Sequence, residues 1–197
     1  MKLYSYVVKD DTGFAPNPFG NHCTLACCKP KIRKMATPRD WVVGTGSKNN
    51  VGSYKIIYAM KITEKMTLAE YAKDKRFECK VPRTGKIEER GDNIYYKDAN
   101  GDMNQRRGYH NEKSFNKDIS GEYVLISNHF YYFGEKAVDI PVEYRNFIKT
   151  GPGHRCNFDN LFAEGFVAWL EKSFTKGLLG DPYDFRVRAV DFTCGVS

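Results

Sequence analysis

Two runs of apolar and β-branched residues predict a pair of neighbouring strands in the first third of the chain. Residues 39–47 are mostly apolar, with a charged start and glycines near the end, which is typical of a strand buried on both faces. Residues 54–63 are mainly β-branched, aromatic or otherwise apolar, and this composition also favours a strand. The connection at 48–53 is polar and contains glycine, so we expect the two strands to form a hairpin-like pair.

Helix signals occur at two places along the chain. Thr67 is a candidate N-cap and Glu70 completes a capping box, which predicts a short helix over about 68–73. Apolar side chains recur at helical spacing over 159–174, where Asp159 suits the N-cap or the first turn. We expect this longer helix to bury its apolar stripe in the core.

Short strands dominate the remaining pattern. They are predicted at 2–9, 123–127, 130–133 and 185–190, and Asn100-Gly101 is a hairpin signal. Many short strands with one long helix predict an α+β fold. We expect a bent, mostly antiparallel sheet or partial β-barrel, with the C-terminal helix packed on it, in a single domain over residues 1–197.

The aromatic run at 130–133 would place one pair of rings on each face of its strand. Core packing on both faces is the more common outcome. Stacking of a nucleic-acid base on one pair is the alternative.

The segment from Asp10 to Pro30 has no regular pattern. Two prolines and a glycine within 14–20 disfavour both a helix and an interior strand, while Phe14 and Phe19 require burial. Long loops of this kind are usually functional or disordered. We expect an ordered, packed loop that carries function, and a well-packed surface loop is the alternative.

Basic residues exceed acidic ones by 31 to 24, and the net charge of +7 is consistent with a nucleotide or nucleic-acid partner. In the basic run at 29–34, Lys29 or Arg33 could bind phosphate, although such runs are commonly solvated faces. The basic segment at 103–121 is either a flap over nucleic acid or a solvated insertion, and the second interpretation is favoured.

Membrane and metal signals are weak in this chain. No apolar run approaches the roughly 20 residues that cross a bilayer, and the N-terminus lacks a signal-peptide pattern, which predicts a cytoplasmic protein without a membrane partner. Cys23, Cys27 and Cys28 beside His22 do not have the spacing of zinc ligands. We therefore predict no metal and no cofactor, and the sequence does not indicate an oligomeric state.

A glycine-rich turn at 151–155 presents two polar side chains in succession. Arg155 suits bidentate binding of phosphate or carboxylate, and His154 suits proton transfer or hydrogen bonding to a base. The alternative is that Arg155 pairs with an internal carboxylate such as Asp40 or Asp92.

The small residues Gly44, Thr45 and Gly46 are expected to leave room beside the first central strand. We predict that the loop at 14–33 and the turn at 151–155 meet there across one pocket, which would admit a planar ligand.

Two family resemblances follow from these motifs. Residues 36–71 resemble the core of the PUA-like superfamily, which includes EVE, ASCH and YTH domains, with Arg39-Asp40 where a Gly-Asp turn is usual. Further motifs resemble the second of the nucleotide modification associated domain families; they lie at 14–20, 23–26, 28–33, 40–47, 91–95 and 153–155. This second resemblance implies a role in making or handling modified nucleotides in phage or bacteria, and it assigns no reaction to any residue.

Two functions remain open at this point. The first is a binding module for a nucleobase, nucleotide or nucleic acid, with DNA expected over RNA. The second is a transferase or hydrolase acting on a modified base or nucleotide, with His154 as acid or base and Cys23 or Cys28 as nucleophile. The candidate ligand-binding residues are Asn17, Phe19, Thr24, Lys29, Arg33, Gly44, Thr45, Gly46, Asn93 and Arg155.

Overall fold

A six-stranded mixed sheet forms the centre of the computed structural model, which describes residues 1–83 and 90–184. Its strands lie in the order β1 (Leu3–Val7), β3 (Trp41–Thr45), β4 (Lys55–Lys61), β9 (His129–Tyr132) and β11 (Gly177–Leu178), with β10 (Val138–Asp139) pairing with β4. The pairs β1–β3 and β9–β11 are parallel, and the remaining pairs are antiparallel. The predicted α+β class is confirmed, and the sheet is open rather than closed into a barrel.

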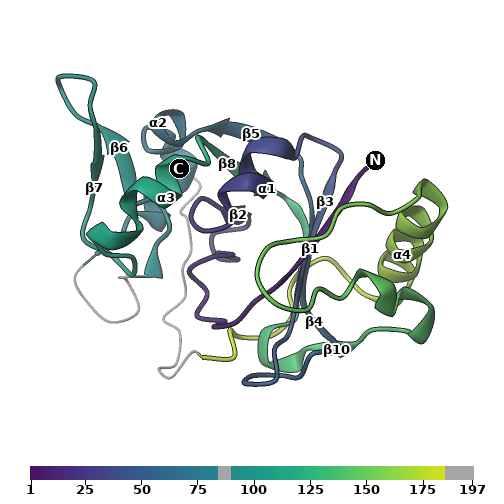
Figure 1. Ribbon diagram of the computed structural model, residues 1–197. Helices are drawn as coiled ribbons and strands as arrows, with labels where there is room; N and C mark the ends of the chain where they lie inside the picture. Colours follow the sequence, from purple (N-terminus) through teal and green to yellow (C-terminus); the bar gives the residue numbers. More distant parts are fainter. Residues whose placement is uncertain (84–89, 185–197) are drawn as a thin grey trace.

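Each face of this sheet is covered by a different layer (Figure 1). On one side lie the strands β2 (Cys23–Leu25), β8 (Tyr123–Ser127) and β5 (Glu64–Thr67) and the helix α1 (Pro30–Met35). On the other side lies α4 (Asn160–Ser173), preceded in the chain by a 3-10 segment at Val142–Phe147. Two separate apolar clusters fill the spaces between these layers.

A third group of elements lies beyond the β2–β8–β5 sheet, away from α4 (Figure 1). It contains the hairpin of β6 (Tyr95–Lys97) and β7 (Met103–Gln105) and the short helices α2 (Leu68–Tyr71) and α3 (Phe115–Ile119). Three 3-10 segments complete the described elements: Lys75–Lys80, Glu112–Ser114 and Gly134–Lys136. A third apolar cluster joins this group to β8.

The aromatic run of β9 is buried on both faces of the central sheet. Phe130 and Tyr132 belong to the cluster on the β2–α1 side, whereas Tyr131 and Phe133 belong to the cluster under α4. Strand alternation therefore separates the two pairs as expected, and core packing occupies both.

Both predicted helix starts are confirmed. Thr67 and Glu70 form the reciprocal capping box at the start of α2. The Asp159 carboxylate accepts a hydrogen bond of 2.8 Å from the amide of Phe162 at the start of α4.

Two elements differ from the sequence-based expectations. The segment at 10–30, predicted as irregular, contains β2, and the basic run at 29–34 folds as α1 with Pro30 in its first turn. The strand predicted at 185–190 lies outside the described residues. None of the helices over 1–83 and 90–184 has the length and apolar character needed to cross a bilayer.

Candidate active site at Cys28

Cys28 occupies the tight turn between β2 and α1. Its φ angle is 59° and that of Lys29 is 39°, so two successive non-glycine residues adopt the left-handed region. Such backbone is uncommon and costly, and it concentrates at functional sites. Cys28 is also partly exposed, whereas Cys23 and Cys27 are fully buried, and all three are free thiols.

Three side chains from distant segments line up at this turn. The Cys28 Sγ atom lies 3.7 Å from Nε2 of His110, and Nδ1 of His110 donates to Oδ2 of Asp118 at 2.6 Å. His110 precedes the 3-10 segment at 112–114, and Asp118 lies on α3. A thiol beside an imidazole that a carboxylate orients is the arrangement of a nucleophile, its base and a positioning acid.

Asp118 holds this arrangement through both of its carboxylate oxygens. Its Oδ1 accepts a hydrogen bond of 2.8 Å from the Cys28 amide, and its Oδ2 also accepts one of 2.9 Å from the Tyr95 hydroxyl. Burial raises the pKa of Asp118, but the His110 hydrogen bond and charge, with the other two donors, outweigh burial and lower the pKa. The carboxylate therefore stays charged and orients the imidazole.

The imidazole of His110 is packed as well as hydrogen-bonded. Its ring centroid lies 4.7 Å from that of Phe14, in the proline-rich loop. Burial lowers the pKa of His110, but the contacts with Asp118 and Cys28 outweigh it and raise the pKa to about 9. The ring is positively charged at neutral pH, so it places a cation beside the Cys28 sulfur.

Arg33 ties the backbone of the site together. Its guanidinium is fully buried and donates to the carbonyls of Cys28 at 2.8 Å and Tyr123 at 2.7 Å, and to that of Asp118. Arg33, a predicted phosphate ligand, thus donates to three backbone carbonyls of the protein. The structure thus gives Arg33 a role in positioning the turn at Cys28 against α3.

A metal centre is the alternative at the same place, since ligand atoms of Cys27, His110 and Asp118 lie within 4.8 Å of one another. However, Asp118 is already engaged by three donors. The Cys27 thiol points to the carbonyl of Asp92 at 3.6 Å, and burial raises its pKa well above the ordinary value. These contacts favour the hydrogen-bonded relay of Cys28, His110 and Asp118 over a metal site.

A second buried polar network lies beneath the proline-rich loop. The ammonium of Lys80 reaches the carbonyls of Asn17 at 3.0 Å and His22 at 2.7 Å, and Oγ1 of Thr24 at 2.9 Å. The Thr24 hydroxyl in turn donates to Asp92 at 2.6 Å. This network fixes the loop. It also brings together the predicted ligand residues Asn17 and Thr24, whose polar groups form hydrogen bonds within the protein.

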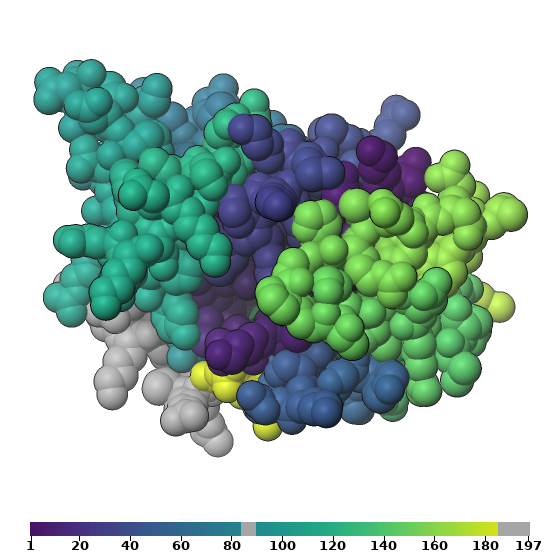
Figure 2. Space-filling view, viewed as in Figure 1, coloured from purple at the N-terminus to yellow at the C-terminus, as the bar shows by residue number. Residues whose placement is uncertain are grey.

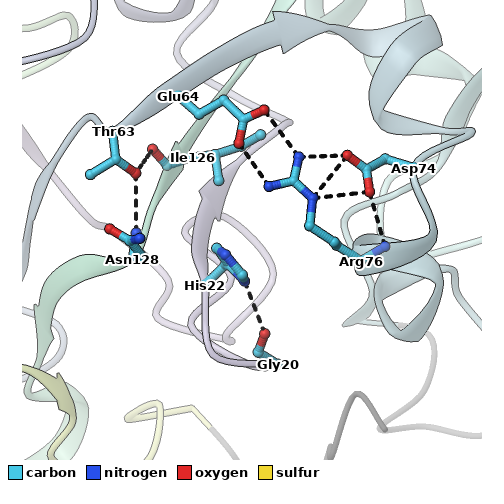
Figure 3. A network of polar contacts seen from close by, with 8 residues as sticks. All are labelled: Gly20, His22, Thr63, Glu64, Asp74, Arg76, Ile126 and Asn128. Atoms are coloured by element: carbon cyan, nitrogen blue, oxygen red, sulfur yellow. Dashed lines mark hydrogen bonds and ion pairs between the residues drawn. The ribbon is translucent and has the colours of Figure 1, made fainter. Parts of the chain in front are cut away.

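An exposed ion-pair network lies nearby and connects β5 to the segment that carries Lys80 (Figure 3). The Arg76 guanidinium donates two hydrogen bonds of 2.9 and 3.0 Å to Glu64 and three of 2.6, 3.1 and 3.1 Å to Asp74. His22 is drawn between this network and Gly20, to whose carbonyl it is bonded at 3.3 Å. Since these ion pairs are solvent-exposed, the buried Lys80 contacts contribute more to holding the loop.

The predicted catalytic pair, Cys23 and His154, occupies different surroundings. Cys23 is buried in β2, where burial raises its pKa to about 12. The ring of His154 lies 6.0 Å from that of Tyr4, and burial followed by the charges of Lys31 and Lys29 lowers the pKa of His154. The described contacts include none between Cys23 and His154, so their catalytic roles stay predictions.

The room expected beside the small residues of β3 is filled. A side chain at Gly44 would meet the ring of Tyr58 at 2.4 Å, and one at Gly46 would meet the carbonyl of Gly52 at 2.2 Å. Thr45 is buried and donates to the Tyr6 carbonyl at 3.3 Å. Protein atoms therefore pack directly against both glycines, and a ligand pocket at this strand stays a prediction.

The remaining predicted ligand residues are dispersed. Phe19 is buried, and Asn93 donates to the carbonyls of Tyr71 and Phe77, each at 3.2 Å. Arg155 donates to the carbonyl of Asn146 rather than pairing with Asp40 or Asp92.

Among the predicted phosphate ligands, Arg155 directly follows His154 in the chain, and Lys29 is close enough for its charge to lower the pKa of His154, after burial and the charge of Lys31. The basic run at 29–34 and the turn at 151–155 thus approach each other at α1, and Arg155 also forms a β-bridge with Ser5 of β1.

His110 and Asp118 are functional candidates that the sequence pattern did not reveal. Both lie in the segment at 103–121, for which the sequence favours a solvated insertion over a flap that covers nucleic acid. In the sequence they appear only as a histidine and an aspartate eight positions apart in a basic segment. Such residues are common in solvated loops, so they do not indicate a site.

A family model described as nucleotide modification associated domain 2 matches residues 1–189. The chain belongs to this family. No curated protein and no solved structure matches it. The family description associates the chain with nucleotide modification, and the PUA-like resemblance stays a prediction.

Proposed function

We propose that this protein is a thiol-dependent transferase or hydrolase that acts on a modified base or nucleotide, with Cys28 as its nucleophile. The alignment of Cys28, His110 and Asp118 carries the proposal. A module that only binds nucleotides has no need of a partly exposed thiol held 3.7 Å from an oriented imidazole. The family description supports a nucleotide as the substrate.

The proposed reaction has two steps. The Cys28 sulfur, stabilised by protonated His110, attacks an electrophilic carbon of the substrate and forms a sulfur–carbon bond. The leaving group departs with the electron pair of its bond and takes the proton from His110. Neutral His110 then removes a proton from water or another acceptor, which attacks the carbon and displaces Cys28, so that the charged pair is restored. Water gives hydrolysis and another acceptor gives transfer.

A binding module is the second candidate, supported by the lysines near His154. Burial and the charges of Lys31 and Lys29 lower the pKa of His154, so these basic groups share one region beside Cys28. Binding to DNA in a phage or bacterial setting would use this region. Both functions predict nucleotide binding, and only the enzyme predicts turnover at Cys28.

Turnover separates the two candidates. Wild type, Cys28→Ser and Cys156→Ser are incubated with nucleotides and with oligonucleotides that carry modified bases, and products are identified by mass spectrometry. We expect turnover by wild type and by Cys156→Ser, which removes another partly exposed free thiol, and none by Cys28→Ser, which still binds substrate. Undiminished turnover by Cys28→Ser would falsify the assignment, and binding without turnover by any variant would favour the module.

A further inference from the structure

A cavity of about 580 Å³ opens against His110. It is lined by the segment from Gln105 to Lys113, which continues from β7 toward α3. Its volume falls within the range of about 300–1,000 Å³ found for small-molecule sites. Because His110 belongs to its wall, a ligand in the cavity lies next to the imidazole that contacts Cys28.

The charge of the cavity wall is strongly positive. Arg106, Arg107 and Lys113 contribute cations, and Glu112 contributes the one carboxylate among the lining residues. His110 also lines the cavity, and its positive charge at neutral pH is paired with the Asp118 carboxylate at 2.6 Å. Such a wall favours an anion over a neutral or cationic ligand.

The wall is also held in place by specific contacts. The Arg106 guanidinium donates to the Asn93 carbonyl at 3.2 Å and lies 4.5 Å from the centre of the Tyr96 ring. The Gln105 amide donates to the carbonyl of His110 at 2.7 Å, which couples the wall to the relay. Within the described residues, the buried Oε1 of Gln105 has no hydrogen-bond partner.

We propose that this cavity holds the phosphate group of the substrate. The inference rests on the proposed function and names the substrate class more closely, as a phosphate-bearing nucleotide or nucleic-acid strand. Guanidinium groups bind phosphate oxygens through paired hydrogen bonds, and Lys113 supplies a mobile cation. Phosphate bound here lies beside His110, whose imidazole contacts the Cys28 sulfur at 3.7 Å.

Binding measurements test this with Arg106→Gln/Lys113→Gln and, as a milder variant, Lys113→Gln alone. The control is Lys48→Gln/Lys136→Gln, which removes two exposed lysines that do not line the cavity. Affinities are measured for a nucleoside 5′-monophosphate and a short single-stranded DNA, with inorganic phosphate as competitor. We expect the double cavity variant to bind roughly tenfold or more weakly and the control to change less than twofold.

Protection of Cys28 gives a readout that does not depend on turnover. Bound phosphate ligand should slow iodoacetamide alkylation of Cys28 in wild type and fail to do so in the double cavity variant. Loss of mononucleotide binding identifies a free nucleotide as the ligand, and loss of strand binding alone identifies the nucleic-acid backbone. Unchanged affinities in the cavity variants, or no binding of any probe by wild type, overturn the cavity assignment, while Cys28-dependent turnover would still support the enzyme.

Discussion

The carboxylate of Asp118 contacts His110 and the Cys28 amide, so its effect can be measured on the reactivity of the Cys28 thiol. We predict that Asp118→Asn slows alkylation of Cys28 by iodoacetamide at neutral pH by about tenfold or more, because the imidazole loses its orientation and its charge partner. The rates are measured by mass spectrometry of the labelled peptides. Cys156, which contacts Asn157 outside the relay, is the internal reference and should label at an unchanged rate. Equal slowing at both thiols would indicate a global structural change instead.

The His110–Asp118 pair should also make stability depend on pH. The pKa of His110 rises from 6.5 to about 9 on folding, since the Asp118 and Cys28 contacts outweigh burial. The stabilisation is therefore complete below about pH 6.5 and is lost as pH rises through about 9. The lowered pKa of Asp118 removes the same stabilisation when pH falls below its ordinary value of 3.8.

We predict that wild type exceeds His110→Gln in unfolding free energy by up to about 3 kcal/mol near pH 5–6. The difference should shrink steadily between pH 6.5 and 9. Urea unfolding at a series of pH values measures it. A difference that grows toward alkaline pH would contradict the assigned charge pair.

At the scale of elements, the proline-rich loop depends on the segment at 75–80 through one buried cation. We predict that Lys80→Met lowers the unfolding free energy by about 3–5 kcal/mol. The substitution leaves the buried Asp92 without the lysine charge and removes the donor to the carbonyls of Asn17 and His22. Arg76→Ala, in the same segment, should cost no more than about 1 kcal/mol, because its ion pairs are exposed. Urea unfolding measures both variants. Similar losses of unfolding free energy for Lys80→Met and Arg76→Ala would contradict the greater contribution assigned to the buried Lys80.

The packing of α3 against α1 is tested at Gly121. A methyl group there would lie 2.5 Å from the guanidinium carbon of Arg33, which bonds the carbonyls of Cys28 and Asp118. We predict that Gly121→Ala displaces Arg33, lowers the melting temperature and slows Cys28 alkylation together. Gly101→Ala is not a matched control because its φ is positive, so Ser120→Ala, at an exposed neighbouring position, serves instead. If Gly121→Ala lowers stability but leaves the alkylation rate of Cys28 unchanged, Arg33 does not position Cys28.

The elements that could be predicted from sequence are those set by local patterns. The β3–β4 pair, the capping box at Thr67 and the start of α4 at Asp159 depend on neighbouring residues, and the structure confirms each one. The relay depends instead on tertiary contact between Cys28 and His110, which are 82 residues apart. Gly44 is a second example of a tertiary contact that the sequence does not predict. The small residue suggests room for a ligand, but Tyr58 from the next strand packs against it.

At the scale of the molecule, the turn at Cys28 lies between two lobes of different sequence origin. In Figure 2 the purple and dark blue atoms of the first 35 residues are set between teal atoms of the β6–α3 region and light green atoms around 145–165. The positively charged cavity near His110 belongs to the first lobe, and the turn with His154 belongs to the second. A nucleic-acid strand that crosses from one lobe to the other would pass over the N-terminal segment, which includes Cys28.

The net charge of +7 should make such binding sensitive to salt. We predict that affinity for single-stranded DNA falls linearly in a plot of log affinity against log salt, with a slope of about −0.7 for each phosphate neutralised. Lys31→Gln should make the slope shallower by about 0.7, because Lys31 lies beside His154 at the crossing, whereas Lys48→Gln should leave it unchanged. Fluorescence anisotropy at several salt concentrations, with DNA and RNA of the same sequence, measures the slopes and tests the expected preference for DNA. A ligand held by a single phosphate gives a slope near −1 or shallower. Such a slope for every DNA or RNA tested would place the bound phosphate in the His110 cavity alone. It would exclude a nucleic-acid strand that spans both lobes.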